Sequence, residues 1–479
     1  MSDTARLVAD PSATDRPNVT VRRSAPSWAA MLAALIVGTL ATGVLLQVFH
    51  PFIRHDDWMS MLPGDAPGSS GQFARNRFEG RWLNTVYWVL IGQWTSIVVA
   101  SIVFFAAHCA FTCGFIRFFR LRNPGAIFVA TLAAFVSPIW VRLTYWPGTL
   151  SASMIVAATA AWTLPWARRR RLTMSAWLLL FVALSVLSYP PVAAPVFLCL
   201  VVAELRSRVR RLALLAAGFI LAYGVGVLTV YTFNWFAFGE FGITISAWRG
   251  PNPLVSLDTL TENLARYGHQ FANVCSVLGW AGVISLACLL LAVLDASTRR
   301  PALVALAGVG VVVGLEAAQT VYSGVVAGPR ASLWAWPAAF MPAVLLLKGT
   351  GTSRRLGVVA LVGLAVVGGL TWRSDLGEHQ ATRVQYDAIV SDVASVVAEH
   401  PTDRVVMWME PRLRKSAAGN MTAVTIQQML YDQRGIYPRW CKPLDCDSIA
   451  EAVALQPKAD VLRVDELTVV RLPRPPAWL

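Results

Sequence analysis

Residues 97–116 read IVVASIVFFAAHCAFTCGFI, an apolar stretch of twenty residues without a charged side chain. A helix of this length is about 30 Å long, which matches the hydrocarbon core of a bilayer. In lipid the backbone must satisfy its own hydrogen bonds, so such a segment crosses the membrane as a helix. The stretch therefore predicts a helical membrane protein.

Comparable apolar segments recur between Trp28 and Thr371. The 479 residues are 56% hydrophobic and 14% charged, with a mean hydropathy of +0.54, which excludes an ordinary soluble domain. We predict an α-helical polytopic membrane protein with about eleven transmembrane helices. The predicted spans are 28–49, 97–116, 126–145, 150–166, 176–188, 192–202, 212–233, 272–294, 303–321, 333–347 and 356–371.

The distribution of charge predicts how the chain is oriented. The formal net charge is +14, and the basic residues concentrate in short connectors between apolar segments. This pattern is typical of cytoplasmic loops and does not indicate a nucleic-acid partner. We expect residues 1–27 to be a disordered cytoplasmic tail. An odd number of spans then places a first loop over 50–85 and everything after Thr371 on the extracytoplasmic side.

The segment 176–202 is interrupted by Tyr189-Pro190-Pro191, and each half is shorter than a standard span. One kinked span would place the basic runs before and after it on opposite faces of the membrane. The charge rule disfavours that arrangement. We therefore predict a tight hairpin.

Residues 28–371 form the predicted transmembrane domain, which would carry the site. Residues 372–479 change in character and predict a small extracytoplasmic α/β or α+β domain, with strands near 404–409 and 461–472. Within it, Cys441 and Cys446 flank four residues, and on an oxidising side of the membrane they predict a disulfide. Free thiols or a metal pair are the alternatives.

The tract His55-Asp56-Asp57-Trp58 follows the first predicted span and concentrates polar groups beside the bilayer. Charged groups there are costly unless they line a wet cavity or bind a charged ligand. Asp56 or Asp57 could deprotonate a hydroxyl or bind a divalent cation. The structural alternative is a helix N-cap, which needs only one carboxylate. His55 and Trp58 are further site candidates.

A second polar group lies about twenty residues later. Arg77 and Arg81 are spaced to share a helix face, where their guanidinium groups could hold a phosphate. Contact with lipid headgroups is the structural alternative. Glu79 either pairs with Arg75 or acts as a second acid.

Three further candidates come from the predicted topology. Arg142 and Arg330 fall on the same face as Asp56, and Arg330 is a candidate phosphate ligand. Glu316 lies inside a predicted span, so it must face the bundle interior, pair with another group or be protonated. A functional role and a buried structural pair are both open for it.

The sequence has no phosphate-binding loop, dinucleotide-binding glycine pattern, zinc motif or nucleophile elbow. Its Asp-Asp-Trp tract after the first span, followed by Gly80-Arg81-Trp82, resembles the Gtr-type O-antigen glucosyltransferases of the GT-C superfamily. The motif covers residues 54–88, and the later spans match by hydropathy alone. The resemblance implies a GT-C-like membrane enzyme of the bacterial inner (plasma) membrane. Such an enzyme transfers a sugar from a polyprenyl-phosphate donor to a cell-envelope glycan or glycolipid acceptor.

The resemblance further implies that Asp56 or Asp57 is the catalytic base and that Arg81 positions the donor or its loop. Arg142 and Arg330 match no family motif. No cofactor is required for a single displacement, although paired aspartates leave a divalent metal open. The expected partners are the lipid-phosphate donor, the acceptor and membrane lipid.

Two other functions fit the same sequence. A transporter or flippase of lipid-linked sugars would also need cationic residues facing an amphipathic substrate. A non-catalytic subunit of envelope assembly is the third possibility. In that case, replacing the aspartates would change stability or partner binding rather than turnover.

Overall fold

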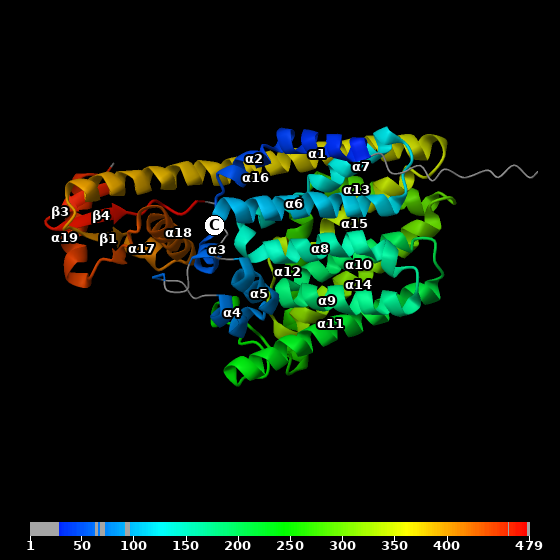
Figure 1. Cartoon of the computed structure of the whole chain (residues 1–479), viewed down its shortest axis with the longest axis horizontal. Coiled ribbons are helices and arrows are strands. Elements are labelled where there is room, and N and C mark those ends of the chain that lie inside the picture. Colours follow the sequence, from blue (N-terminus) through cyan, green and yellow to red (C-terminus); the bar gives the residue numbers. More distant parts are fainter. Residues whose placement is uncertain (1–27, 63–65, 68–71, 92–95, 458, 477–479) are drawn as a thin grey trace, which may run out of the picture.

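The computed structural model describes residues 28–62, 66–67, 72–91, 96–457 and 459–476. The predicted tail 1–27 and part of the loop 50–85 lie outside these residues. The described chain is mostly helical, with a long bundle and a small sheet domain at one end (Figure 1).

Six of the described helices are long and apolar enough to cross a membrane, which indicates a multi-pass membrane protein. A seventh candidate is the pair formed by α12 (Leu257–Leu278) and α13 (Trp280–Leu294), which is bent by 95°. The count of eleven spans therefore stays a prediction. The six long helices are α6 (Ile97–Ile116), α8 (Pro147–Ala167), α9 (Arg171–Ser188), α11 (Val209–Phe238), α14 (Arg299–Ser323) and α16 (Gly351–Glu399).

Three predicted spans are broken in the structure. Span 28–49 divides at Gly43, whose φ of +72° ends one helix before the next begins. Span 126–145 stops being α-helical at Phe135, three residues before Pro138, which lacks an N–H for the helix. Span 272–294 bends at Gly279, with φ +48°. The shorter helices are α1 (Trp28–Thr42), α2 (Val44–Phe49), α5 (Trp82–Ile91), α7 (Pro124–Phe135), α10 (Ala193–Ala203) and α15 (Ala335–Leu346).

The predicted hairpin at the Pro-Pro pair is confirmed. Arg168, just before α9, lies 2.9 Å from the carboxylate of Glu204, just after α10. The chain therefore leaves along α9 and returns along α10 to the same end of the bundle. The turn between them is η4 (Pro190–Val192).

Small residues allow the helices to approach closely. A Cβ built on Gly114 of α6 would lie 2.8 Å from Ala161 of α8, and one on Gly308 of α14 would lie 2.6 Å from Val201 of α10. In lipid there is no hydrophobic driving force between helices, so their association depends on close packing of this kind.

The helix α16 joins the bundle to the C-terminal domain. Its 49 residues extend about 73 Å at 1.5 Å per residue, so it projects well beyond the other helices (Figure 1). It runs without a break through Thr371 and Trp372, and the indole of Trp372 is fully buried against the bundle. The predicted domain boundary at 371/372 therefore falls inside a helix.

The C-terminal domain is an α/β unit built on a four-stranded sheet in the order β2-β1-β4-β3. β1 is parallel to both β2 and β4, whereas β3 and β4 form an antiparallel hairpin. Cys441 and Cys446 form the predicted disulfide. The elements are β1 (Arg404–Trp408), α17 (Pro411–Arg414), α18 (Ala417–Arg434), β2 (Arg439–Trp440), α19 (Pro443–Leu455), β3 (Val461–Val464) and β4 (Leu467–Arg471).

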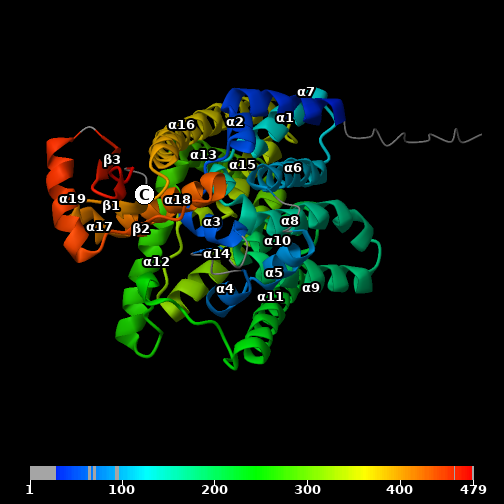
Figure 2. The same cartoon turned by 60° about the vertical axis from the view of Figure 1, so that its left-hand side comes forward.

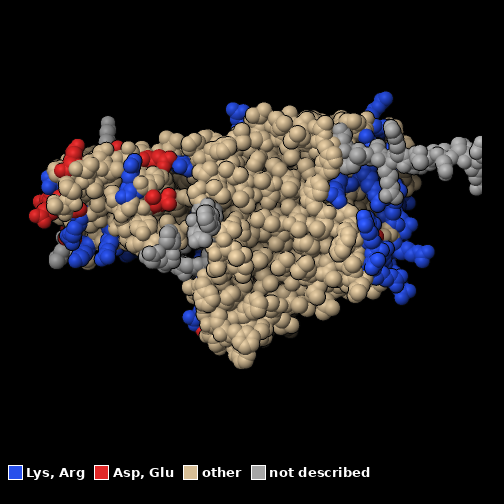
Figure 3. All heavy atoms as spheres, in the orientation of Figure 1, with Lys and Arg blue, Asp and Glu red and all other residues tan. Residues whose placement is uncertain are grey.

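Charged residues gather at the two ends of the molecule and leave the middle of the visible face uncharged (Figure 3). Basic residues crowd the end away from the C-terminal domain, and both signs of charge mix on that domain. An uncharged band of this kind is expected of a lipid-facing surface.

Candidate functional site

A cavity of about 1180 Å³ lies where the bundle meets the C-terminal domain. The helix α16 contributes one side of its polar lining, and five short elements contribute much of the rest. They are α3 (His55–Met61), α4 (Gln72–Glu79), η3 (Val141–Tyr145), η5 (Ala247–Arg249) and η6 (Pro329–Ala331). The charged lining comprises Arg54, Arg75, Arg81, Arg142, Arg249 and Arg330 with Asp56, Glu79, Asp375 and Glu378.

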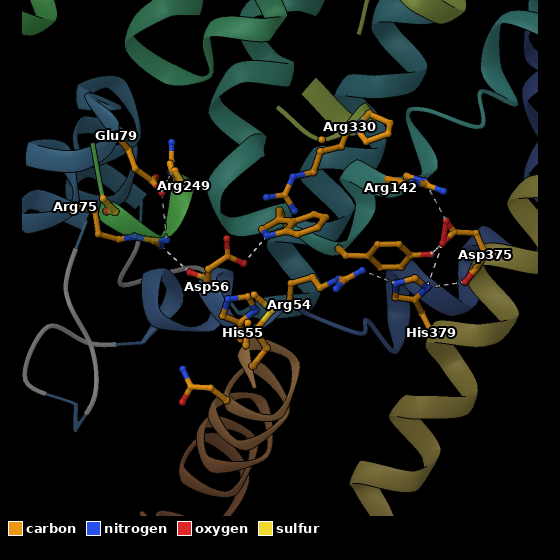
Figure 4. Close-up of a pocket in the computed structure, with 18 of the residues that line it drawn as sticks. Arg54, His55, Asp56, Arg75, Glu79, Arg142, Arg249, Arg330, Asp375 and His379 are labelled. Atoms are coloured by element: carbon orange, nitrogen blue, oxygen red, sulfur yellow. Dashed lines mark hydrogen bonds and ion pairs between the residues drawn. The ribbon is translucent and has the colours of Figure 1, made fainter. Parts of the chain in front are cut away.

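Asp56 lies at the centre of this cavity (Figure 4). The indole Nε1 of Trp146 donates to its Oδ1 at 2.6 Å, and a guanidinium nitrogen of Arg75 donates to its backbone oxygen at 2.6 Å. Burial alone would raise the pKa of Asp56, but interactions with His55, Arg330, Arg75 and the Trp146 N–H outweigh it and hold the pKa below its usual value. The side chain is therefore a carboxylate at neutral pH.

Asp57 has a different role, and it does not line the cavity. It is fully buried, and its carboxylate accepts hydrogen bonds from the backbone N–H groups of Gly148 at 2.8 Å and Thr149 at 2.7 Å. These are free donors in the first turn of α8, whose first residue, Pro147, has no N–H. Asp57 thus caps a helix remote in sequence. Burial raises the pKa of this carboxyl to about 7, although the bonds from Thr149 and Gly148 oppose the rise.

Two arginines lie over the ring of Trp146. The guanidinium carbon of Arg330 is 3.8 Å from the ring centroid, and that of Arg54 is 5.3 Å away. Burial and the charge of Arg330 lower the pKa of Arg54 to about 10. Arg330 makes no hydrogen bond or ion pair with the residues that the structure describes. Two close cations of this kind favour an anion between them.

Glu79 gathers three cations on one side of the cavity. Its carboxylate lies 3.2 Å from Arg81, 3.6 Å from Arg75 and 3.8 Å from Arg249. Arg81 also lies over the ring of Tyr189, 5.1 Å from the centroid. Glu79 therefore has a structural role, because its carboxylate positions these guanidinium groups.

Asp375 and His379 of α16 form the opposite side of the cavity (Figure 4). Asp375 accepts from the hydroxyl of Tyr145 at 3.1 Å and lies 3.2 Å from Nδ1 of His379 and 3.9 Å from Arg142. The His379 ring stacks on Tyr145 with centroids 3.7 Å apart, and its Nε2 lies 3.4 Å from Arg54. This cluster positions Arg54 and Arg142.

The sequence analysis missed Asp375 and His379, although a signal for them existed. Both follow the last predicted span by a few residues, as Asp56 follows the first. Charged residues just beyond a span, on the same predicted side of the membrane as Asp56, are candidates for the same site. The predicted domain boundary at 371/372 placed both residues in the extracytoplasmic C-terminal domain instead.

Several predicted site residues lie away from the cavity. α4 ends at Glu79, and Gly80 with φ +65° turns the chain, so Arg77 and Arg81 do not share a helix face. Arg77 pairs with Glu240 in an exposed position. Trp58 is buried in the core.

His55 and Glu316 lie near the charged lining but in different ways. His55 lines the cavity, and burial lowers its pKa, although the neighbouring Asp56 opposes that shift. Glu316 lies in α14 outside the lining and accepts from Gln270, from the hydroxyl of Ser332 and from the indole of Trp334. Its partners are neutral donors rather than a cation.

Among the described residues, no group of three or more His, Cys, Asp or Glu side chains is placed to hold a metal ion. The positive charge that the described lining presents comes from guanidinium groups. Comparison of the chain with protein-family models, curated proteins and solved structures gives no match.

Proposed function

We propose that the protein is a membrane glycosyltransferase that takes a sugar from a polyprenyl-phosphate donor. The observation that carries the proposal is the arrangement around Trp146. Its ring lies beneath Arg330 and Arg54, and its N–H holds Asp56. An anion-binding pair of guanidinium groups thus lies directly beside a carboxylate. A phosphate leaving group and a base are the two requirements of sugar transfer from a lipid phosphate.

The proposed reaction is a single displacement with inversion. Asp56 takes the proton from an acceptor hydroxyl as the hydroxyl oxygen bonds to the anomeric carbon. The bond from that carbon to the phosphate oxygen breaks, and its electron pair stays on the phosphate. Arg54 and Arg330 would stabilise the negative charge that develops on the phosphate. Electrostatic stabilisation of this kind is usually the largest contribution to lowering the barrier.

Asp56 is a better candidate for the base than Asp57. Asp56 lines the cavity and is held as a carboxylate. Asp57 is fully buried, and its oxygens are occupied by the first turn of α8. A base must reach the proton that it removes.

The wider proposal keeps the topology predicted above: eleven spans, a cytoplasmic N-terminus in the bacterial inner membrane, and the cavity on the outer face. The basic end opposite the C-terminal domain supports this orientation (Figure 3). The acceptor would be a cell-envelope glycan or glycolipid. A transporter is the weaker alternative because most of the charged lining lies on or beside short elements at one end of the bundle. Asp375 and Glu378, which lie on α16, line the same cavity, and a transporter would be expected to place such groups on helices at its middle.

The test is sugar transfer by the purified protein from a panel of polyprenyl-phosphate sugars. Asp56→Asn should lower the rate of transfer about a thousandfold while leaving donor binding intact. Asp392→Asn, the same change at an exposed position of α16, is the matched control. Transfer by the Asp56→Asn protein at the native rate would remove Asp56 as the base. Binding of donors without transfer by the native protein would favour the transporter.

A further inference from the structure

The helix α12 presents three different faces. At about 100° per residue, Asn263, Arg266 and Gln270 lie on one face, and Asn263 and Gln270 are fully buried. A second face carries an apolar stripe, and a third carries polar and charged side chains. The stripe contains Leu257, Leu260, Leu264 and Phe271, and the third face contains Asp258, Glu262, His269 and Asn273.

The buried face of α12 holds the loop that follows Arg249. Asn263 donates to the backbone oxygen of Asn252 at 2.7 Å, and Arg266 donates to that of Gly250 at 2.8 Å. Both bonds lie within three residues of Arg249, which lines the cavity. The position of Arg249 is therefore tied to α12.

The same face holds the loop that carries Arg330. Oε1 of Gln270 accepts from the backbone N–H of Ala327 at 2.9 Å, and its Nε2 donates to Glu316. Glu316 in turn accepts from Ser332 at 2.5 Å. Arg330 lies between Ala327 and Ser332, so the loop is held on both sides of it.

The other two faces of α12 match a membrane interface. Leu257, Leu264 and Phe271 are 79%, 51% and 41% exposed, so the protein leaves the stripe uncovered. Asp258 and His269 lie on the opposite side and are also exposed. An amphipathic helix of this pattern lies flat at the interface, with its stripe in the acyl chains.

The direction of α12 agrees with this position. It bends by 95° from α13, which packs against α15 and α16 of the bundle. Figures 1 and 2 show α12 at the end of the bundle nearest the C-terminal domain. Because α13 packs against the candidate span α16, a helix perpendicular to α13 is placed to run along the membrane plane.

We propose that α12 is an interfacial helix that uses the lipid surface to position Arg249 and Arg330 in the cavity. Its apolar stripe fixes the depth of α12 in the outer leaflet. The hydrogen bonds of Asn263, Arg266 and Gln270 then hold the loops that carry Arg249 and Arg330 at a set position relative to the membrane surface. Asn263, Gln270 and Glu316 are thus positioning residues. The significance of the arginines rests on the proposed function, but the placement of the helix and its tethers do not.

The first experiment measures depth with nitroxide labels on the full chain in phosphatidylcholine and phosphatidylglycerol vesicles. Cys275, the exposed native thiol of α12, is first changed by Cys275→Ser. A label at Leu264→Cys should collide more with oxygen, and one at His269→Cys more with a water-soluble nickel complex. Equal access to oxygen at both positions would show a helix surrounded by lipid and overturn the interfacial placement. Equal access to nickel would show that it lies in water.

The second experiment tests the tethers without any assay of function. An added Cβ at Gly328 meets nothing within 4 Å, so Gly328→Cys accepts a label beside Arg330. Gln270→Ala should mobilise this label, whereas Asn273→Ala, on the water-facing side of the same helix, should not. An unchanged spectrum with Gln270→Ala would overturn the tether.

The third experiment connects the tether to anion binding through a double-mutant cycle with polyprenyl phosphate. Gln270→Ala should weaken binding about tenfold in the native background and have no further effect on Arg330→Ala. Full additivity would show that Gln270 does not act through Arg330. Failure of the native protein to bind polyprenyl phosphate would contradict the proposed function, while the two labelling results would still decide the placement of α12.

Discussion

The indole of Trp146 donates a hydrogen bond from Nε1 to Oδ1 of Asp56 at 2.6 Å. This bond both aims the carboxylate and helps to lower its pKa. Trp146→Phe keeps an aromatic ring under Arg330 but removes the donor. We expect the turnover rate to fall about tenfold to a hundredfold, since a hydrogen bond to a charged group contributes about 1.5–3 kcal/mol. The acid limb of the pH–rate profile should move to higher pH.

The matched control for this change is Trp162→Phe. Trp162 also donates from its indole, to the backbone oxygen of Ala110 at 2.9 Å, but it lies outside the cavity lining. It should leave the pH–rate profile unchanged. A profile that moves equally in both variants would mean that the shift does not come from Asp56.

Arg330 is expected to contribute to affinity for the lipid phosphate. Because its guanidinium makes no ion pair with a carboxylate among the described residues, Arg330→Ala breaks no salt bridge. It removes an anion ligand, and the loss of its charge also raises the pKa of Asp56. The dissociation constant for polyprenyl phosphate should rise about tenfold to a hundredfold. The dissociation constant of Arg330→Lys should lie between those of the native protein and Arg330→Ala. Its ammonium keeps the positive charge but lacks the two-pronged donor geometry of a guanidinium.

Arg77→Ala separates this effect from a general loss of positive charge. Arg77 pairs with Glu240 in an exposed position outside the cavity. Its replacement should leave the dissociation constant within about twofold of the native value, as expected for an exposed ion pair. Equal weakening by Arg77→Ala and Arg330→Ala would show that bulk charge, not a defined site, attracts the phosphate.

Asp57 is expected to support stability rather than chemistry. Asp57→Ala would leave the N–H groups of Gly148 and Thr149 buried without acceptors. We expect a loss of about 3 kcal/mol, because each unsatisfied buried donor costs about 1–3 kcal/mol. Ser96→Ala removes the exposed cap of α6, which accepts from Val99 at 3.2 Å, and should cost about 1 kcal/mol. Thermal denaturation in detergent measures both. A smaller loss for Asp57→Ala than for Ser96→Ala would contradict the capping role.

Hydropathy predicted the helical class because an apolar run of twenty residues has few other structures available to it in lipid. It could not predict breaks that depend on single residues. Gly279 interrupts an apolar segment that passes every test of length and composition. The result is the 95° bend between α12 and α13, and Asn263 and Gln270 bond α12 to loops that lie elsewhere in the chain.

The candidate site was predictable where its residues lie close together in the chain. Asp56 and Glu79 are twenty-three positions apart and follow one predicted span. Asp375 and His379 lie some three hundred residues away and reach the cavity only because α16 continues beyond the bundle. The choice between Asp56 and Asp57 was open in sequence because adjacent acids differ only in which way each side chain points.

The pKa of Asp57 makes stability depend on pH with a defined sign. Burial raises its folded pKa to about 7, well above the usual 3.8. Between about pH 4 and pH 7 the folded state retains a proton that the unfolded state has released, so stability should fall as the pH rises. Below pH 4 both states are protonated, and above pH 7 the contribution becomes constant. The full change corresponds to about 4 kcal/mol.

Asp57→Asn isolates this contribution, because its amide does not titrate. The midpoint of thermal denaturation, measured as native minus Asp57→Asn from pH 4 to pH 8, should decrease across the window and then level off. Acids that do not interact with Asp57 titrate equally in both proteins and cancel in the difference, whereas Asp56, which is coupled to Asp57, is already a carboxylate across most of this window. A difference that increases with pH would mean that the bonds from Gly148 and Thr149 outweigh burial and that Asp57 caps α8 as a carboxylate.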